Sequence, residues 1–566
     1  MPRAPAALML AAFWLAALPL EACNAPRVAS TPADDLGPAG DPTNNNADGS
    51  PTDIGAPSDP RPACSDCWRS TLFPDNWTPA FEDSEGHSLP DFSYAGYHNG
   101  EVALPDLVSG SFFNVLDYGA DNQGVSDATA AIQQAIDDAS IDGGRVLLPA
   151  GSYRCDGLLE VHAPNVMIRG AGPASTQVLF TRDTGMSSLA SLTFSGNVQE
   201  GPDLLLVADA APRDMHVWVS DASSLAVGDD ISIGWIITDA FVAEHGMTGI
   251  WQISNGQWRP FFRRNVVALD LTTSPNMITI DVPIRYPTRT RDQASVRRES
   301  GYLSECGVEA LAVSNAVGWD AAWTNSQAHA IHMVGVKDCF INQVESFPSP
   351  LAPGGHHLQS GGIRLTNSKR VTIAESRMEK AQNRGGGGNG YLFEIVKSGE
   401  ILIRDTVGHD GRHNFIQNWD FGTSGCVFLR CDSAGGTMLG SKDDSVGTPA
   451  WCEYHHSLAM ANLVDGCVLQ DGWFGGNRLT ESTGAGHTTT QGVFWNVSGG
   501  GLLTSTQYGW GYVIGPGDMT VLTTLLLPQA IGTAPEDWVE RPPGTGPLNP
   551  TSLYEDQLRR RLGIPP

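Results

Sequence analysis

Two histidines, an aspartate and an arginine stand close together in the run His409-Asp410-Gly411-Arg412-His413. An imidazole can take up a proton near neutral pH, and a guanidinium can hold a carboxylate by paired hydrogen bonds. A polysaccharide lyase needs both functions, because it neutralises the carboxylate of a uronate and then removes the acidified C5 proton. In this interpretation Arg412 is a base and His413 is its partner. The predicted catalytic group comprises His409, Asp410, Arg412 and His413.

A second polar group follows at Lys442-Asp443-Asp444, inside a glycine-rich stretch. In a lyase, Lys442 is an alternative base, and Asp443 and Asp444 would supply the oxygen ligands that calcium prefers. In a glycoside hydrolase, the same aspartates would form the required pair of carboxyl groups, one as the acid and one activating water. A loop of this composition is equally typical of a solvated turn. Calcium is therefore predicted for the lyase alternative, and no other cofactor is expected.

Basic and aromatic side chains in the neighbouring segments are candidates for holding a polymer. A guanidinium or an imidazole can bind an acid group, and an indole can stack on a sugar ring. For Trp473 the alternative is packing between layers of the fold. The predicted substrate-binding residues are His356, His357, Arg384, Trp473 and Arg478.

These groups fall in long segments that follow short, repeated strands. Phe340, Val371, Ile401 and Val427 each stand in a strand-turn-strand pattern, at intervals of about 31, 30 and 26 residues. Such repeats are typical of a solenoid in which each repeat forms one coil. Equivalent turns then stack at the β-strand spacing of roughly 4.8 Å, so the long loops would line one side of the coils. A β-sandwich also has short strands, but its turns do not return to one Asn/Gly-then-Val-x-Ile pattern.

The N-terminal part of the repeat region carries a more specific signal. It contains, in order, NVLDYGADNQGVSDATAAIQQAID, GGRVLLPAGSYR and VMIRGAG, with a short amphipathic helix over residues 128–137. This order resembles the N-terminal signature of the pectate-lyase-like β-helix proteins. The resemblance implies an all-β, single-stranded right-handed parallel β-helix, an N-terminal capping helix and a polysaccharide partner. In the similar polygalacturonases the paired aspartates precede a Gly-His segment, whereas here Asp443 and Asp444 follow it, so the hydrolase assignment is not transferred.

Composition, the strand pattern and the resemblances together divide the chain into seven segments. They are a lipoprotein signal (1–23), a disordered tether (24–62), an N-terminal extension (63–110), the cap and first coils (111–203), a β-rich insertion (204–298), coils with groove loops (299–530) and a C-terminal tail with a short helix (531–566). The ending Leu-Glu-Ala-Cys23 is similar to the bacterial lipoprotein signal, in which the cysteine is lipidated; an ordinary cleaved signal is the alternative. We therefore expect export with a lipid anchor at the cell envelope, or secretion. In an exported chain, Cys64-x-x-Cys67 favours a local disulfide.

The net charge limits the partners that are compatible with this chain. It has 62 acidic against 34 basic side chains and a formal charge of -28, so a nucleic-acid partner is not expected. Neutral sugars, calcium, or a polyanion held in a locally basic groove remain compatible. We predict an extracellular polysaccharide lyase or glycoside hydrolase that acts on a uronate-rich or pectin-like polymer. The alternative is a noncatalytic surface protein that binds glycan or mediates adhesion, and the oligomeric state is left open.

Overall fold

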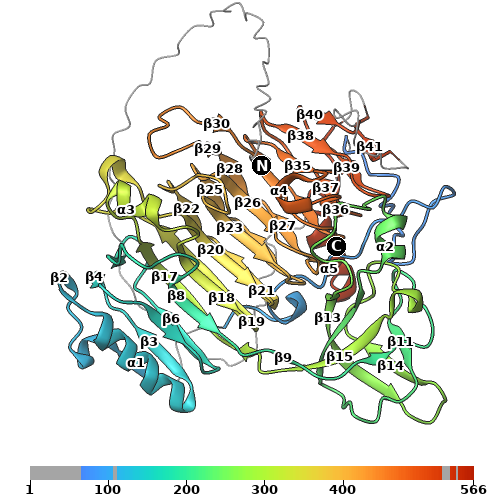
Figure 1. Ribbon diagram of the computed structural model, residues 1–566, viewed down its shortest axis with the longest axis horizontal. Coiled ribbons are helices and arrows are strands. Elements are labelled where there is room, and N and C mark those ends of the chain that lie inside the picture. Colours follow the sequence, from blue (N-terminus) through green and yellow to red (C-terminus); the bar gives the residue numbers. More distant parts are fainter. Residues whose placement is uncertain (1–65, 106–110, 525–535, 543–545, 566) are drawn as a thin grey trace, which may run out of the picture. The chain divides into compact units, whose positions relative to one another are not determined.

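The computed structural model describes residues 66–105, 111–524, 536–542 and 546–565. Parallel strands from successive turns of the chain pair with one another and form three ladders (Figure 1). The first ladder consists, in stacking order, of β1 (Phe112–Asn114), β3 (Gly144–Leu147), β6 (Val166–Arg169), β17 (Gly307–Ser314), β19 (Val336–Ser346), β21 (Lys369–Ala374), β24 (Leu402–Arg404), β27 (Val427–Leu429), β33 (Leu463–Asp465), β37 (Val493–Trp495), β39 (Tyr512–Ile514) and β41 (Trp538–Glu540).

The other two ladders complete each coil. The second ladder consists of β2 (Gln123–Asp127), β4 (Gly151–Cys155), β7 (Thr176–Phe180), the later residues of β17 and β19, β22 (Arg377–Glu379), β25 (Val407–His409), β28 (Asp432–Ala434) and β34 (Val468–Leu469). The third ladder consists of β5 (Leu159–Val161), β8 (Ala190–Ser195), β18 (His329–Val334), β20 (Gly361–Thr366), β23 (Tyr391–Val396), β26 (His413–Asn418), β31 (Cys452–Tyr454), β35 (Trp473–Gly475), β38 (Leu502–Ser505) and β40 (Thr520–Leu522). The fold is therefore an all-β parallel β-helix, as predicted.

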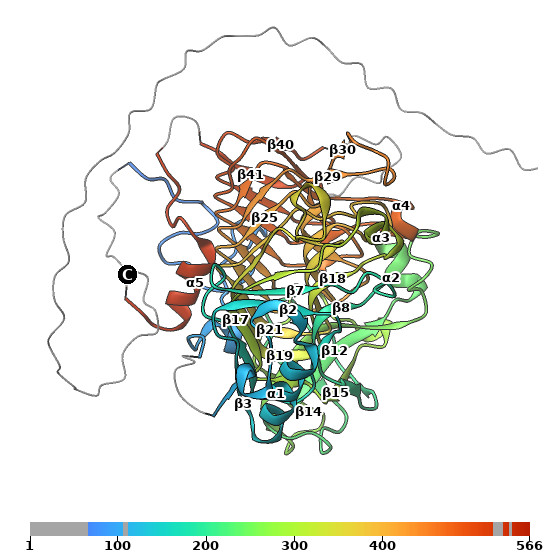
Figure 2. The same cartoon turned by 90° about the vertical axis from the view of Figure 1, so that its left-hand side faces the viewer.

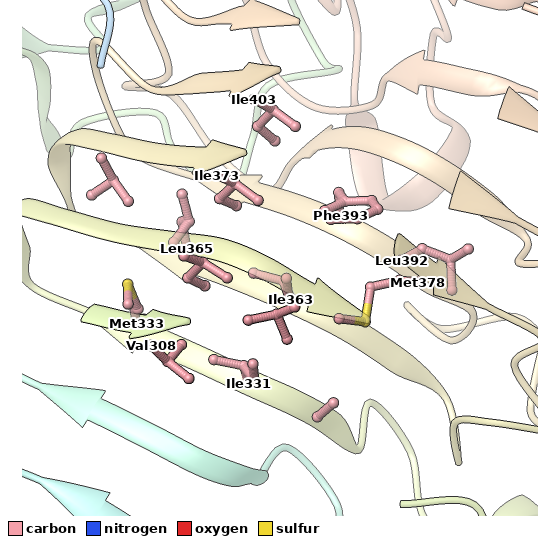
Figure 3. Close-up of a cluster of buried hydrophobic side chains, with 14 of the residues drawn as sticks. Val308, Ile331, Met333, Ile363, Leu365, Ile373, Met378, Leu392, Phe393 and Ile403 are labelled. Atoms are coloured by element: carbon pink, nitrogen blue, oxygen red, sulfur yellow. The ribbon is translucent and has the colours of Figure 1, made fainter. Parts of the chain in front are cut away.

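Apolar side chains stack on one another inside the coils (Figure 3). Ile331, Ile363 and Phe393 occupy paired positions on consecutive strands of the third ladder, and each is fully buried. The next residue in that row is Phe415, whose ring stacks on the ring of Phe393 at 5.0 Å. Seven cysteines of the described residues are free and buried, so stacking in the interior, rather than bridging, is their role.

Helix α1 (Thr129–Asp142) packs against the first strands of the coils, at one end of the ladders in Figure 1. Ile132, Ala135 and Ile136 are buried and join the same core as the coil interior. The predicted helix over residues 128–137 is therefore present and extends five residues further along the chain. Asp127 contributes at its start, because its side chain accepts a hydrogen bond from Thr129 N at 2.9 Å.

The predicted alignment of the repeats differs by one residue from the observed strand pairing in two places. Phe340 pairs with Thr372, not with Val371, and Leu402, not the preceding isoleucine, pairs with Val427. A shift of one residue exchanges the two faces of a strand. Val371 accordingly lies in the coil interior, whereas Phe340 packs in a separate cluster.

Residues between β8 and β17 form a separate antiparallel sheet. It contains β9 (Gln199–Glu200), β10 (Leu204–Leu205), β11 (His216–Val219), β12 (Asp230–Ile236), β13 (Trp258–Asp270), β14 (Asn276–Ile280) and β15 (Ser295–Ser300), with α2 (Asp239–Glu244) beside them. Trp235 and Trp251 are almost fully buried in the core of this insertion, and Trp235 stacks on Phe261 at 3.6 Å. These two tryptophans therefore fill the core of the insertion.

Buried ion pairs attach the insertion to the coils. Glu400, just before β24, accepts from Arg264 at 3.0 Å and lies 3.3 Å from Arg285, and all three side chains are at most 2% exposed. Lys369 on β21 similarly reaches Asp230 at 2.9 Å. Because an unpaired buried charge is costly, these contacts fix the insertion in one position on the coils.

Replacement of Glu400 by alanine should destabilise the protein strongly. It leaves the guanidiniums of Arg264 and Arg285 buried without their carboxylate, which costs about 3–5 kcal/mol of unfolding free energy. Arg298→Ala is the matched control, since Arg298 is 56% exposed in its pair with Asp229 and an exposed pair contributes at most about 1 kcal/mol. Urea unfolding of both variants measures the difference, and equal midpoints would contradict the prediction.

The two ends of the described chain pack together on the outer side of the first ladder (Figure 2). Tyr554 of α5 (Leu553–Arg561) donates to Ala95 O at 2.8 Å, and Gln557 Nε2 donates to Pro90 O at 2.9 Å. We call residues 66–105 together with α5 the terminal clasp. Its apolar side chains share a cluster with strands β24, β27, β33, β37 and β39. The segments predicted as an extension and a tail are thus one structural unit.

A buried carboxyl group holds the start of α5. Asp465 Oδ2 on β33 accepts from Ser552 Oγ at 2.8 Å and from Tyr554 N at 2.9 Å. Burial raises the pKa of Asp465 to about 7. A carboxyl group whose pKa is raised in the folded state stabilises that state while it is protonated. The contribution of Asp465 to the free energy of unfolding is therefore fully present below about pH 4, and it declines as the pH rises to about 7.

Docking of α5 should therefore weaken between pH 4 and pH 7 and change little above it. Amide hydrogen exchange of α5, corrected for the intrinsic pH dependence of exchange, measures this effect. In Asp465→Asn, which cannot ionise, the corrected protection should be nearly independent of pH. The same pH dependence in wild-type protein and variant would show that another group is responsible.

The predicted lipid site Cys23 and the tether lie outside the described residues, as does Cys64. Cys67 is disulfide-bonded. Among the described residues, none of the helices combines the length and apolar character that a membrane span requires.

Candidate active site

The turn from the second to the third ladder separates two histidines that are close in the sequence. His409 ends β25, and its ring nitrogens lie 3.5 Å from Glu379 Oε1 and 3.4 Å from Asp432 Oδ1. Asp410 makes the turn with φ of 58°, and His413 begins β26. The predicted catalytic run is therefore divided between two environments, one on each ladder.

A buried carboxylate on β31 gathers side chains from neighbouring coils. His413 Nε2 lies 3.1 Å from Glu453 Oε1, and His455 Nδ1 contacts the same oxygen. Arg478, which follows β35, donates from Nη1 to Glu453 Oε2 at 2.6 Å. We call these four residues the Glu453 cluster. Its two imidazoles and its carboxylate are less than a tenth exposed, whereas the Arg478 side chain is 18% exposed.

Burial and charge set the protonation states in the Glu453 cluster. Burial alone would raise the pKa of Glu453, but His413, His455 and Arg478 outweigh it and hold this pKa well below its usual value. Burial lowers the pKa of His413 to about 4, so its imidazole is neutral at higher pH. The Nδ1 atom lies 2.5 Å from the Trp451 carbonyl oxygen and therefore carries the proton. The buried Nε2 atom lies 3.1 Å from Glu453 Oε1 and, in this tautomer, carries the lone pair that accepts a proton.

Tyr391 and Arg412 lie beside the Glu453 cluster. Tyr391 on β23 pairs with His413 on β26, and their ring centroids are 5.2 Å apart. The Arg412 guanidinium lies 5.7 Å from the centroid of the Tyr391 ring and donates to Gly385 O at 2.9 Å. Burial raises the pKa of Tyr391 above its usual value, so the phenol stays protonated. A proton acceptor, a proton donor and two guanidiniums therefore lie close together.

A metal ion is a weaker assignment for the same place. Ligand atoms of His413, Glu453 and His455 all lie within 4.8 Å of one another. However, Arg478 Nη1 lies 3.0 Å from His455 Nδ1 as well as bonding Glu453, so a cationic side chain already fills this position. Two imidazoles also do not suit calcium, which prefers oxygen ligands only. The geometry therefore favours proton-transfer chemistry.

A second carboxylate, Glu394, lies two strands away from Glu453 in the third ladder. Glu394 on β23 pairs with Ile416 on β26, and Ile416 pairs with Glu453 on β31. Glu394 accepts from Asn418 Nδ2 at 2.6 Å and lies 3.2 Å from Arg364 Nε. Burial raises the pKa of Glu394 above its usual value. One carboxyl group with a raised pKa and one with a lowered pKa thus share this face.

The sequence did not single out Tyr391, Glu394 or Glu453. Each stands in a strand whose other residues are mostly apolar, in YLFEIV and CEY. A lone acid in such a strand is a signal that could have identified Glu394 and Glu453, because a buried carboxylate requires partners.

Two predicted binding residues make structural contacts within the coils. Trp473 is 1% exposed and packs in the coil interior against Phe428 and Tyr454, with ring centroids 5.1 and 5.3 Å away. His357 is 4% exposed, and its Nδ1 pairs with Ser346 Oγ at 2.9 Å. Both predictions are corrected, since these side chains stabilise the coils.

The Lys442 segment reaches away from the Glu453 cluster. It joins β29 (Thr437–Met438) to β30 (Thr448–Pro449), and Lys442 Nζ lies 2.5 Å from Asp320 Oδ1 on α3 (Trp319–Thr324). Asp444 closes its own turn by accepting from the backbone nitrogens of Gly440 and Gly447 at 2.9 and 2.8 Å. Both oxygens of the Asp444 carboxylate therefore already accept backbone hydrogen bonds. We call this segment, residues 439–447, the arm, and it contacts α3.

Other predicted residues meet in a small cavity beside this arm. A cavity of about 230 Å³ is lined by Gly354, His356, Lys380, Ala381, Arg384 and Asp410. We call it the basic pocket. The structure thus brings together the three predicted residues His356, Arg384 and Asp410, which belong to successive coils.

One exposed tryptophan borders the Glu453 cluster, and a second lies beside the neighbouring His456. Trp451 is 44% exposed, and its Nε1 lies 3.3 Å from Glu453 Oε2. Trp419 is 41% exposed, and its ring centroid lies 4.4 Å from that of His456. Large exposed indoles next to a polar site are suited to stacking on sugar rings.

Comparisons with known proteins match parts of this chain. Residues 112–204 match the family of rhamnogalacturonase A/epimerase, pectate lyase-like proteins. Mannuronan C5-epimerase AlgE5 of Azotobacter vinelandii is 50% identical over 74 residues, which are 12% of this chain and 7% of the epimerase. Alginate lyase 7 of the same organism is 45% identical over 74 residues, or 12% of this chain and 8% of the lyase. The matched part is thus a small fraction of these relatives.

Two solved structures illustrate the structural similarity. The tailspike gp61 of Pseudomonas phage phi297 has a TM-score of 0.48 and 13% identity, and the alignment covers 73% of this chain and 67% of the tailspike. The A-module of mannuronan C5-epimerase AlgE6 of Azotobacter vinelandii has a TM-score of 0.27 and 13% identity, covering 76% of this chain and all of the module. By its own strand pairing the chain is a parallel β-helix protein, and its residues 112–204 are similar to the rhamnogalacturonase A/epimerase, pectate lyase-like family.

Proposed function

We propose that the protein is a polysaccharide lyase that acts on a uronate polymer lying over the third ladder. The observation that carries the proposal is a neutral His413 imidazole that lies beside a protonated Tyr391, with its Nε2 3.1 Å from the ionised Glu453. Arg412 and Arg478 are the cations that such chemistry needs for the sugar carboxylate. The names of the matched relatives, C5-epimerases of mannuronan and an alginate lyase, support this choice.

The proposed reaction is an elimination across C5 and C4 of the sugar. Arg412 and Arg478 neutralise the uronate carboxylate and so acidify the C5 proton. His413 Nε2 accepts this proton, and Glu453 stabilises the resulting imidazolium. The electron pair of the C5–H bond forms the C4–C5 double bond, the bond from C4 to the glycosidic oxygen breaks, and Tyr391 donates its proton to that oxygen. Arg412, predicted as the base, is here a carboxylate ligand because a guanidinium remains charged.

A glycoside hydrolase is the second candidate, and Glu394 is the observation that favours it. A carboxyl group with a raised pKa could act as the acid while ionised Glu453 activates water. Glu394 already accepts from Asn418 and lies 3.2 Å from Arg364 Nε, and these contacts favour its ionised form, which places the hydrolase second. A noncatalytic protein would bind glycan on the same face and would form neither the lyase product nor the hydrolase product.

One assay on the full-length protein separates these functions. Polymannuronate, polyguluronate and polygalacturonate are incubated with it, and new reducing ends and ultraviolet absorbance of unsaturated uronate are recorded together. A lyase produces both signals, whereas a hydrolase produces only reducing ends. Binding to a polymer with neither signal would overturn the lyase proposal in favour of a binder.

We also propose export of the chain with a lipid on Cys23. The disulfide at Cys67 supports export, because disulfides persist mainly in oxidising compartments. Cys23→Ser should move the protein from the membrane fraction to the soluble fraction of the cell envelope. An unchanged distribution would contradict lipid attachment at this residue.

A further inference from the structure

We propose that the basic pocket binds the carboxylate of a second uronate unit, so that the protein selects polymers with uronates in succession. This inference rests on the proposed function and specifies its substrate class. The pocket would be a second carboxylate-binding site, in addition to the site formed by Arg412 and Arg478. A polymer in which neutral sugars separate the uronates would fill only one of the two places.

The first argument is the charge of the pocket lining. Within the described part of the chain, neither Lys380 nor Arg384 forms an ion pair or a side-chain hydrogen bond, and Arg384 Nε is buried without a partner. Asp410 is the only carboxylate among the lining residues. His356 Nδ1 lies 2.7 Å from Pro353 O and so donates to it, which leaves Nε2 as a further polar atom at the pocket.

Unpaired cations are unusual in this protein. Its formal charge is -28, and many of its arginines are paired with carboxylates, as Arg478 is with Glu453. A half-buried guanidinium without a carboxylate loses hydration and gains no partner in return. Burial accordingly lowers the pKa of Arg384, with Asp410 acting against it. An incoming carboxylate would supply the missing partner.

The second argument is the connection between the pocket and the Glu453 cluster. Gly390 stands between the two, since a Cβ on it would lie 3.0 Å from Arg384 Cα and 2.8 Å from Arg412 Cβ. Arg412 in turn donates to Gly385 O, one residue after Arg384. The backbone that positions the pocket therefore also positions a guanidinium of the proposed active site, as one polymer spanning both places requires.

The rim of the pocket offers a surface for a sugar ring. The Trp319 ring lies 5.2 Å from the ring of His356 between centroids, and its Nε1 donates to Lys442 O at 2.9 Å. The arm around Lys442 therefore holds this indole beside the pocket. A sugar unit that places its carboxylate near Arg384 could stack on Trp319.

The test measures binding without turnover, in full-length protein carrying His413→Ala. Isothermal titration uses three probes: an oligomer of consecutive uronates, an oligomer in which uronate alternates with a neutral sugar, and a sulfated neutral oligosaccharide. Lys380→Gln with Arg384→Gln should raise the Kd for consecutive uronates roughly 10²- to 10⁴-fold, because hydrogen bonds to charged groups each contribute about 1.5–3 kcal/mol and two of them are lost. The Kd for the alternating oligomer should not change.

Arg298→Gln, on the exposed surface of the insertion, is the matched control and should leave every Kd unchanged. An unchanged Kd of the double variant for consecutive uronates would overturn the pocket assignment, and so would an equal loss for both uronate probes. Preference for the sulfated probe that depends on Lys380 and Arg384 would overturn the carboxylate assignment. Failure of the proposed function is distinct, because it is read from the absence of products with wild-type protein.

Discussion

Replacement of His413 by alanine is expected to lower kcat on the responsive polyuronate by roughly 10²–10⁴-fold, the usual contribution of a general base. KM should change much less, because Arg412 and Arg478 still hold the carboxylate. The measurement is the initial rate of double-bond formation. In the wild-type protein this rate should fall as the pH drops through about 4, where His413 gains its proton.

The control for this substitution is His162→Ala. His162 has a side chain that is 62% exposed and lies next to Glu160 at 3.3 Å, so it reproduces a histidine beside a carboxylate at the surface. Its removal should leave kcat unchanged. A His413→Ala protein that keeps its thermal transition and more than about a tenth of its kcat would remove His413 from the mechanism.

The Glu453→Gln variant is expected to lose roughly 10²–10⁴-fold in kcat, since the imidazolium formed at His413 then lacks its carboxylate. The same substitution should also change the pH dependence of the rate. The Glu453 charge raises the pKa of His413 against the effect of burial, so its removal should move the acid limb of the rate profile below pH 4. A profile of kcat/KM against pH measures both effects.

A purely structural role of Glu453 would lower the rate without moving the acid limb. An unmoved limb would therefore contradict the proposed coupling between Glu453 and His413. Glu160→Gln is the matched control, because it removes the exposed carboxylate beside His162. It should change neither kcat nor the pH profile.

The coils could be predicted from the sequence because the spacing of strand pairs repeats, but their register could not be fixed. Phe340 and Val371 look equivalent in the repeat, yet one packs outside the interior and the other inside it. Pairing is decided by packing between coils, which a single pattern of apolar residues leaves open to a shift of one position.

The candidate site was predictable only in part, for a related reason. His413 and Arg412 follow a turn that is rich in polar residues, and such turns are visible in the sequence. Glu453 comes from the next coil, and only the stacking of β26 on β31 brings it to His413. Trp473 has the residue type of a sugar ligand, but its position on β35 directs it into the interior.

The terminal clasp changes how a stack of coils can lose its structure. In a solenoid each coil contacts only its neighbours, so opening can begin at an end and proceed one coil at a time. Here Leu402, Leu463 and Tyr512, from β24, β33 and β39, pack into a single cluster with the terminal clasp. Unfolding of one coil therefore disrupts packing contacts that the other coils share. Amides from β24 to β39 should therefore exchange with a common free energy of opening, and cutting the chain ahead of α5 should abolish that uniformity.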